Sequence, residues 1–179
     1  MSSTRQTSDE RRAALVEAAL VAFARSGLHG TAVSTVTEAV GITQPYAFSL
    51  FGTKKGLFLA AVEHCFDRVS ETFEKAAAGV PKRKRLKAMG SAYTELLSDR
   101  TVLQMQMQCF AACGDDEIRA VVRSRLERLF ELIQDLAGVS AEKAREFLAA
   151  GMMCNLAATV DLPLLLPGDL AGPDCPSIP

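Results

Sequence analysis

The residues best suited to specific recognition chemistry are neutral polar side chains gathered in residues 44–49. The Gln44 amide carries donors and an acceptor, so it can pair with two atoms on the edge of an adenine. Pro45 or Tyr46 can lie against a thymine methyl group, and the hydroxyls of Tyr46 and Ser49 can bind phosphate or base edges. These residue types predict a surface that contacts double-stranded DNA.

Two short helical patterns must position these side chains. The first pattern ends at Gly41, and its apolar face consists of Val33, Val36 and Val40. Residues 41–43 form the predicted turn, because glycine tolerates the left-handed conformation and Thr43 can cap the second helix. Thr31 is expected to cap the first helix. The second helix is expected to face inward through Ala47, Phe48 and Phe51. The whole stretch, residues 31–51, therefore predicts a helix-turn-helix.

The rest of the chain predicts an all-α fold, because apolar residues recur at helical spacing and no segment alternates as a strand does. A capping box at Thr7 and Glu10 begins the first helix, and Gly27 is expected to end it. Residues 7–53 form a predicted three-helix head. A long helix from Lys54 joins it to an antiparallel helical bundle for ligand binding and dimerisation, residues 54–179, with an irregular Pro-rich tail at 161–179.

Charge is unevenly distributed along the 179 residues, although the formal net charge is only −1. Residues 1–56 are mildly basic and residues 101–179 are acidic, but residues 31–51 contain no Lys or Arg. Lys54 and Lys55 follow after two further residues and are predicted to contact phosphate. The predicted DNA-contacting residues are Thr31, Thr43, Gln44, Pro45, Tyr46, Ser49, Lys54 and Lys55. A second basic run, residues 82–85, either holds DNA or an acidic partner or is a solvated helix start, and we favour the solvated start.

Composition excludes several classes of protein. No apolar run is long enough to cross a membrane, and residues 2–12 lack the apolar segment of a signal peptide. The five cysteines form an odd set without a Cys-x-x-Cys pair, which favours a reducing cytoplasm. With two histidines and no phosphate loop or metal-ligand spacing, we expect no catalytic residue, no metal and no cofactor.

Two further sites are predicted from the helices after Lys54. Methionines, an aromatic ring and an amide suit an adaptable, mostly apolar cavity, and the same residues also suit an ordinary core. The candidate pocket residues are Met89, Tyr93, Met105, Gln108 and Met152. The last two long helices can complete the core of a monomer or pack against a second copy as a four-helix interface. The candidate interface residues are Leu126, Leu129, Ile133, Phe147, Leu148, Gly151, Met152 and Asn155.

Residues 11–62 resemble the N-terminal DNA-binding domain of TetR-family transcriptional regulators. The matching residues, in order, are Leu15, Ala18, Ala19, Phe23, Gly27, Thr31, Val33, Val36, Gly41, Ile42, Thr43, Phe48, Phe51, Lys54 and Leu57. The resemblance implies a homodimer that binds a palindromic operator and represses transcription until a small molecule binds the body. It also implies that Lys54 contacts a phosphate. Phe48 stands where the family has a tyrosine that contacts the DNA backbone, and Thr37 where it has a tightly packed alanine.

Two other functions stay open. Cys109 and Cys113 lie one helical turn apart and suggest a repressor that senses oxidants, although an intact helix does not easily meet disulfide geometry. A helical protein that binds small molecules without contacting DNA is the other alternative.

Overall fold

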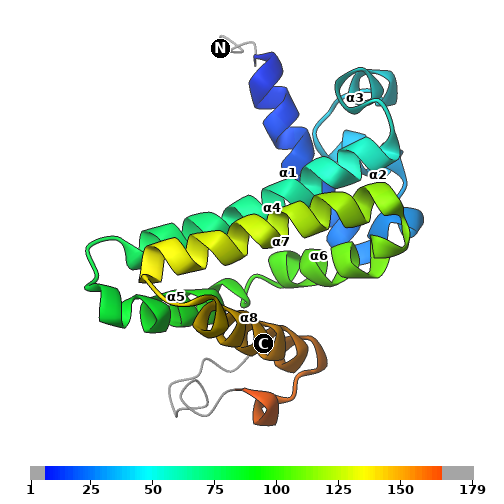
Figure 1. The fold of residues 1–179 in the computed structure, drawn as a ribbon. Helices are drawn as coiled ribbons and strands as arrows, with labels where there is room; N and C mark the ends of the chain where they lie inside the picture. Colours follow the sequence, from blue (N-terminus) through cyan, green and yellow to red (C-terminus); the bar gives the residue numbers. More distant parts are fainter. Residues whose placement is uncertain (1–6, 167–179) are drawn as a thin grey trace, which may run out of the picture. The chain divides into compact units, whose positions relative to one another are not determined.

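The computed structural model describes residues 7–166, and every regular element in that part is helical. The predicted all-α fold is confirmed. The helices are α1 Ser8–Gly30, α2 Val33–Ala39, α3 Gln44–Phe51, α4 Lys54–Ala77, α5 Lys82–Leu96, α6 Arg100–Ala111, α7 Asp116–Ala137 and α8 Ala141–Val160 (Figure 1). Two 3₁₀ turns, η1 Ala112–Gly114 and η2 Pro163–Leu165, complete the order. The predictions for residues 167–179 of the tail lie outside the described residues.

Local signals set most helix ends. The Thr7 hydroxyl accepts a hydrogen bond from the Glu10 amide, and the Glu10 carboxylate accepts one from the Thr7 amide, which confirms the capping box. Ser140 caps α8 by accepting a hydrogen bond from the Lys143 amide at 3.3 Å. The prediction for Gly27 needs correction. Its φ is +66°, as expected, but it forms a kink inside α1, and a further helical turn continues to Gly30.

The chain divides into two compact units, and neither is continuous in sequence. The first consists of residues 7–65 and 105–122, so the end of α6 and the start of α7 pack with α1–α3 and the first half of α4. Its core contains Leu15, Phe23, Val36 and Phe58, and the rings of Phe23 and Phe58 meet edge to face at 5.1 Å.

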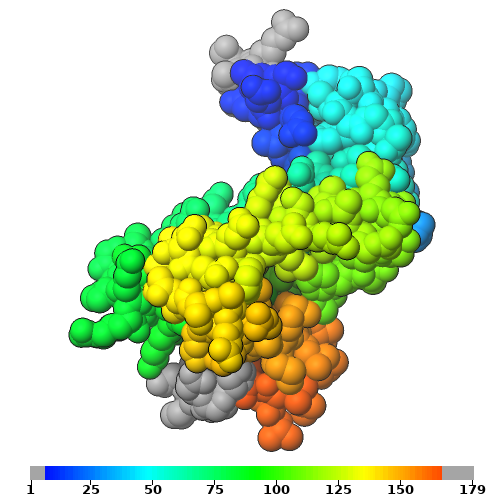
Figure 2. Space-filling model, in the orientation of Figure 1, coloured from blue at the N-terminus to red at the C-terminus, as the bar shows by residue number. Residues whose placement is uncertain are grey.

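The second unit consists of residues 66–104 and 123–166. The Phe73 ring lies 5.8 Å from the Tyr93 ring and 5.6 Å from the Phe147 ring. Helix α5 packs against α8, and α8 also packs against η2, whose residues lie beside it in Figure 2 (orange to red). Among residues 7–166, no helical stretch combines the length and apolar composition that a bilayer span requires.

Candidate nucleic-acid interface

The turn between α2 and α3 has the geometry of a helix-turn-helix. Gly41 has a φ of +66°, a conformation that costs glycine little, and the Ile42 amide donates back to the Thr37 carbonyl at 3.0 Å. Thr43 then takes the extended conformation of an N-cap residue, and its carbonyl accepts a hydrogen bond from the Ala47 amide. Pro45 lies in the first turn of α3, where its missing N–H is not needed. The Thr43 side chain makes no capping hydrogen bond and lies exposed.

The predicted orientation of α3 is correct at most positions and wrong at one. Gln44, Pro45 and Ser49 are exposed, while Ala47 is buried against the core. The Ser49 hydroxyl donates to the Tyr46 carbonyl at 2.7 Å. Phe48 was expected to face inward, but its side chain is 40% exposed. In a helix of only two turns, one buried alanine is enough to fix the inward face, so the next residue points outward.

The prediction that Thr31 caps α2 is also wrong. Helix α2 begins after Ala32 and has no side-chain cap, so Thr31 does not cap it. The Thr31 side chain is instead 4% exposed, and its hydroxyl donates to the Gly27 carbonyl at 2.7 Å, with the Ala22 carbonyl 3.2 Å away. The Thr31 hydroxyl thereby ties the residue that follows α1 to carbonyls at and before the kink. This hydroxyl therefore faces inward.

Arg11 is a candidate contact that sequence reasoning missed. A hollow of about 400 Å³ opens beside the turn and is lined by Arg11, Val40, Gly41, Ile42, Thr43 and Tyr46. It combines a guanidinium, a hydroxyl and a phenol next to the start of α3, a set of groups that suits a phosphate. The position of Arg11 one residue after the capping box carries no sequence signal for this role, because only the fold brings α1 to the turn. Arg12, the next residue, stacks over the Phe51 ring at 4.8 Å.

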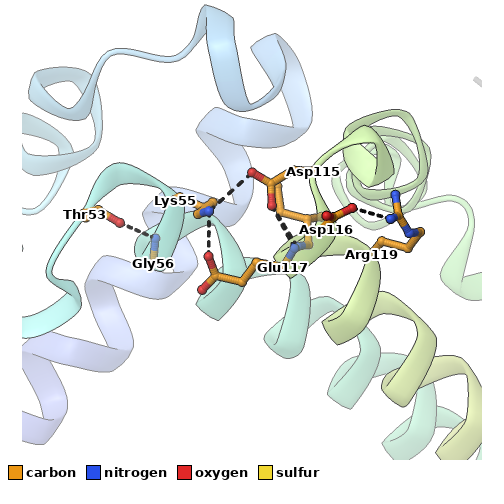
Figure 3. Close-up of polar contacts among 8 residues, drawn as sticks. Thr53, Lys55, Gly56, Asp115, Asp116, Glu117 and Arg119 are labelled. Carbon is orange, nitrogen blue, oxygen red and sulfur yellow. Dashed lines mark hydrogen bonds and ion pairs between the residues drawn. The ribbon is translucent and has the colours of Figure 1, made fainter.

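The two lysines at the start of α4 have different partners. The Lys54 ammonium donates to the His29 carbonyl at 3.1 Å, which ties α4 to the last turn of α1. The Lys55 ammonium lies 2.6 Å from Glu117 Oε2 and 3.3 Å from Asp115 Oδ2 at the start of α7 (Figure 3). Hydrogen bonds to Glu117 and then Asp115 raise the pKa of Lys55 above its ordinary value. Lys55 is thus engaged by carboxylates of its own chain.

Comparison with known proteins agrees with this geometry. Residues 15–61, which span most of α1, all of α2 and α3 and the start of α4, match the family model of bacterial regulatory proteins of the tetR family. Residues 15–61 are therefore a TetR-family DNA-binding domain. This domain identifies the chain as a transcriptional regulator and not an enzyme, and its DNA binding is inferred from the family.

Relatives of this TetR-family chain align over most of its length. The regulator BetI of Burkholderia mallei is 29% identical over 166 residues, which cover 90% of this chain and 83% of BetI. The transcriptional activator FasR of Mycolicibacterium smegmatis is 23% identical over 151 residues, 81% of this chain and 68% of FasR. A solved TetR-like regulator from Rhodococcus sp. RHA1 has the same fold, with a TM-score of 0.68, 20% identity and coverage of 93% of this chain and 92% of that one.

The predicted pocket residues of this TetR-family regulator are distributed over both compact units. Met89 and Met105 are fully buried, the first in the unit of residues 66–104 and 123–166 and the second in the other. The Tyr93 hydroxyl donates to Asn155 Oδ1 at 2.8 Å. The Gln108 amide oxygen lies against Gly27, 2.7 Å from where a Cβ atom would stand. Met152, by contrast, is 45% exposed.

The predicted interface residues differ in how far they are exposed. Leu129, Ile133 and Asn155 are buried within the chain itself, so they are left out of the interface that is proposed below. Leu129 and Ile133 face inward because the apolar face of α7 completes the core of its own chain. An apolar surface is exposed on α8 instead. It consists of Met152, Met153, Leu156 and Val160.

Proposed function

We propose that this TetR-family regulator binds a palindromic operator as a homodimer and represses transcription until a small, mostly apolar molecule binds. The exposed neutral polar face of α3 is the observation that carries the DNA-binding part, because Gln44, Pro45 and Ser49 project from a helix whose opposite side is buried. Such a helix presents its N-terminal residues to base edges in the major groove. As a regulator of bacterial type it acts on DNA in the cytoplasm.

We assign different roles to the residues around α3. Gln44 reads a base edge and Pro45 lies against a base, while Ser49 provides a polar contact further along the helix. Thr43, Tyr46 and Lys54, together with Arg11, bind phosphates and position the domain, residues 7–53. Thr31 is left out of this set because its hydroxyl is turned into the core. Lys55 is considered separately below.

The dimer is supported by the exposed apolar surface on α8. Met152, Met153, Leu156 and Val160 follow one another at helical spacing on one side of the helix, and a contiguous apolar surface of this kind suits a protein partner. A second copy of α8 would bury it across a two-fold axis. Two DNA-binding domains on one dimer also raise affinity, which matters because residues 31–51 contain no Lys or Arg.

The effector site is proposed within the unit of residues 66–104 and 123–166. Buried Met89 and Tyr93 lie there, and Met152 Sδ is 3.8 Å from the Asn155 amide, which itself holds the Tyr93 hydroxyl. Flexible thioethers with one hydrogen-bonded phenol and amide suit a mostly apolar ligand.

Activation of transcription is the specific alternative to repression. FasR, one of the relatives, is named a transcriptional activator. Deleting the gene should raise expression from the bound promoter if the protein represses, and lower it if the protein activates.

The redox alternative is less well supported, because burial raises the pKa of both the Cys109 and Cys113 thiols and so lowers their thiolate fraction.

Selection of bound fragments from genomic DNA, followed by Gln44→Ala, tests the DNA-reading assignment. We expect Gln44→Ala to relax preference at one base position in each half-site, at a cost of about 1–3 kcal/mol for the preferred base. Lys54→Ala should weaken all sequences alike and reduce the salt slope by about 1. Lys75→Ala, an exposed lysine at the other end of α4, is the matched control and should change neither. Equal loss of operator and random DNA in Gln44→Ala would contradict base reading.

A further inference from the structure

Lys55 forms ion pairs with two carboxylates at the start of α7, and this contact bears on how strongly the helix-turn-helix domain binds DNA. Lys55 lies in the first turn of α4, directly after Lys54, and both residues belong to the same compact unit as α3. Its ammonium meets Glu117 at 2.6 Å and Asp115 at 3.3 Å, and all three side chains converge in Figure 3. These side chains remain between about one third and two thirds exposed, so ions and other charged groups can reach them.

Asp115 is held in place by a second set of contacts. Its Oδ1 accepts hydrogen bonds from the Glu117 and Ile118 amides at 3.0 and 3.2 Å and so caps α7, which leaves Oδ2 for Lys55. Hydrogen bonds from the Ile118 amide and from Lys55 lower the pKa of Asp115, so it stays ionised. The carboxylate is thus a fixed anion at a helix start, where the helix dipole favours it.

The charges in this cluster do not balance. Two carboxylates face one ammonium, while neighbouring Asp116 pairs with Arg119 instead (Figure 3). Two carboxylates around an ammonium provide the same anionic oxygens that a DNA phosphate would. Lysine carries its charge on a flexible four-carbon stem, so it can exchange one anionic partner for another.

We propose that Asp115 and Glu117 act as an intramolecular substitute for a DNA phosphate: they hold Lys55 and lower the affinity of the helix-turn-helix domain for its operator. The inference rests on the proposed DNA binding and adds a regulatory contact to it. Asp115 directly precedes α7 and Glu117 lies in its first turn, just after η1. A conformational change that moves these carboxylates away frees Lys55 to bind a DNA phosphate. A change that keeps them in place maintains the lower affinity for the operator.

Operator binding measured at several salt concentrations tests the proposal. Asp115→Asn/Glu117→Gln removes both charges, and asparagine preserves the cap on α7. We expect the slope of log K against log salt to steepen by about 0.9 for each DNA-binding domain, which at 0.1 M salt corresponds to roughly eightfold tighter binding. Circular dichroism and the Tm should match those of the parent protein, because all the altered groups are exposed side chains.

Two controls separate this effect from a general loss of negative charge. Asp116→Asn removes the neighbouring charge that does not contact Lys55, and it should tighten binding by less than the single variant Glu117→Gln. In a Lys55→Gln background, Glu117→Gln should no longer steepen the salt slope. Equal effects of Glu117→Gln and Asp116→Asn, or weaker binding by the double variant, would overturn the proposal. If the parent protein binds no DNA fragment above background, the proposed function itself fails.

Discussion

At the residue scale, Gly27 combines two requirements that no other residue type meets. Its φ of +66° lies in the region that side chains with a Cβ resist, and the Gln108 amide occupies the space where a Cβ would stand. The Gly27 carbonyl also accepts the hydrogen bond of the buried Thr31 hydroxyl. One glycine therefore sets the path of the chain from α1 into α2.

Gly27→Ala should destabilise the protein by about 1–3 kcal/mol, because the combination of φ +66° and ψ 179° is open essentially only to glycine. The Gln108 amide would also have to move. Thermal unfolding of the purified protein measures the loss as a lower Tm. Gly30→Ala is the matched control, since Gly30 has no positive φ and a Cβ there would make only an ordinary contact with Ser26. A Tm unchanged by Gly27→Ala would contradict the conformational argument.

The cysteines allow a second prediction at this scale. Burial raises the pKa of the Cys109 thiol, which donates to the Gln106 carbonyl, and that of the Cys113 thiol, so both remain protonated at neutral pH. Protonated thiols react slowly with peroxide. We expect mild peroxide to leave operator binding within about twofold of the untreated protein, and Cys109→Ser/Cys113→Ser to behave in the same way. Reversible release of DNA by peroxide that the double variant abolishes would establish the redox alternative.

At the scale of elements, arginine side chains in the unit of residues 66–104 and 123–166 form hydrogen bonds that connect the ends of helices. Arg100 at the start of α6 donates to the Ala158 carbonyl near the end of α8, and Arg85 donates to the Leu136 carbonyl near the end of α7. Arg85 also donates to the Val80 carbonyl, so this member of the basic run 82–85 has a structural role. These bonds hold helices together at ends where carbonyls lack partners.

Asp99, which caps α6, should make stability depend on pH. Partial burial raises its pKa, but hydrogen bonds from Arg68 at 2.8 Å and from the Thr101 amide outweigh burial, so the pKa lies below its ordinary value. Its stabilising contribution is therefore complete above the unfolded-state pKa of about 3.9 and is lost as pH falls through the lower folded-state pKa.

Asp99→Asn should lower the free energy of unfolding by about 0.5–1 kcal/mol at pH 7, because solvent partly screens this half-buried ion pair. The difference from the parent protein should shrink below about pH 4. Urea unfolding at several pH values measures both effects. Asp135→Asn, at an exposed site on α7, serves as the control. A destabilisation that stays constant down to pH 2.5 would show that the charge of Asp99 is not responsible.

At the scale of the whole molecule, the proposed dimer surface on α8 should determine whether two DNA-binding domains act together. Leu156→Glu places a charge in the centre of this surface, where Leu156 is 46% exposed and is not needed by the chain's own core. We expect the variant to keep its Tm but to sediment as a monomer and to bind the operator at least about 100-fold more weakly. Val21→Glu, at a similarly exposed apolar residue on α1, should remain dimeric. A dimeric Leu156→Glu variant would place the interface elsewhere.

The sequence by itself determined the features that depend on neighbours along the chain. The caps at Thr7 and Ser140 predict the starts of α1 and α8, and helical periodicity with the glycine at position 41 predicts the helices and the turn of the helix-turn-helix. Hydrogen bonds and backbone preferences there involve residues only a few positions apart. The outward direction of Gln44 and Ser49 followed from the same periodicity.

Only the tertiary structure decided the features that depend on segments far apart in sequence. Phe48 faces outward although it is apolar, and Ile133 faces the core of its own chain instead of a partner. Arg11 reaches the turn because α1 passes beside it, and Lys55 meets Asp115, 60 residues away at the start of α7. Periodicity reports which face of a helix is apolar, but not which other helix or which charged group that face meets. That choice is made by packing, which brings distant segments into contact.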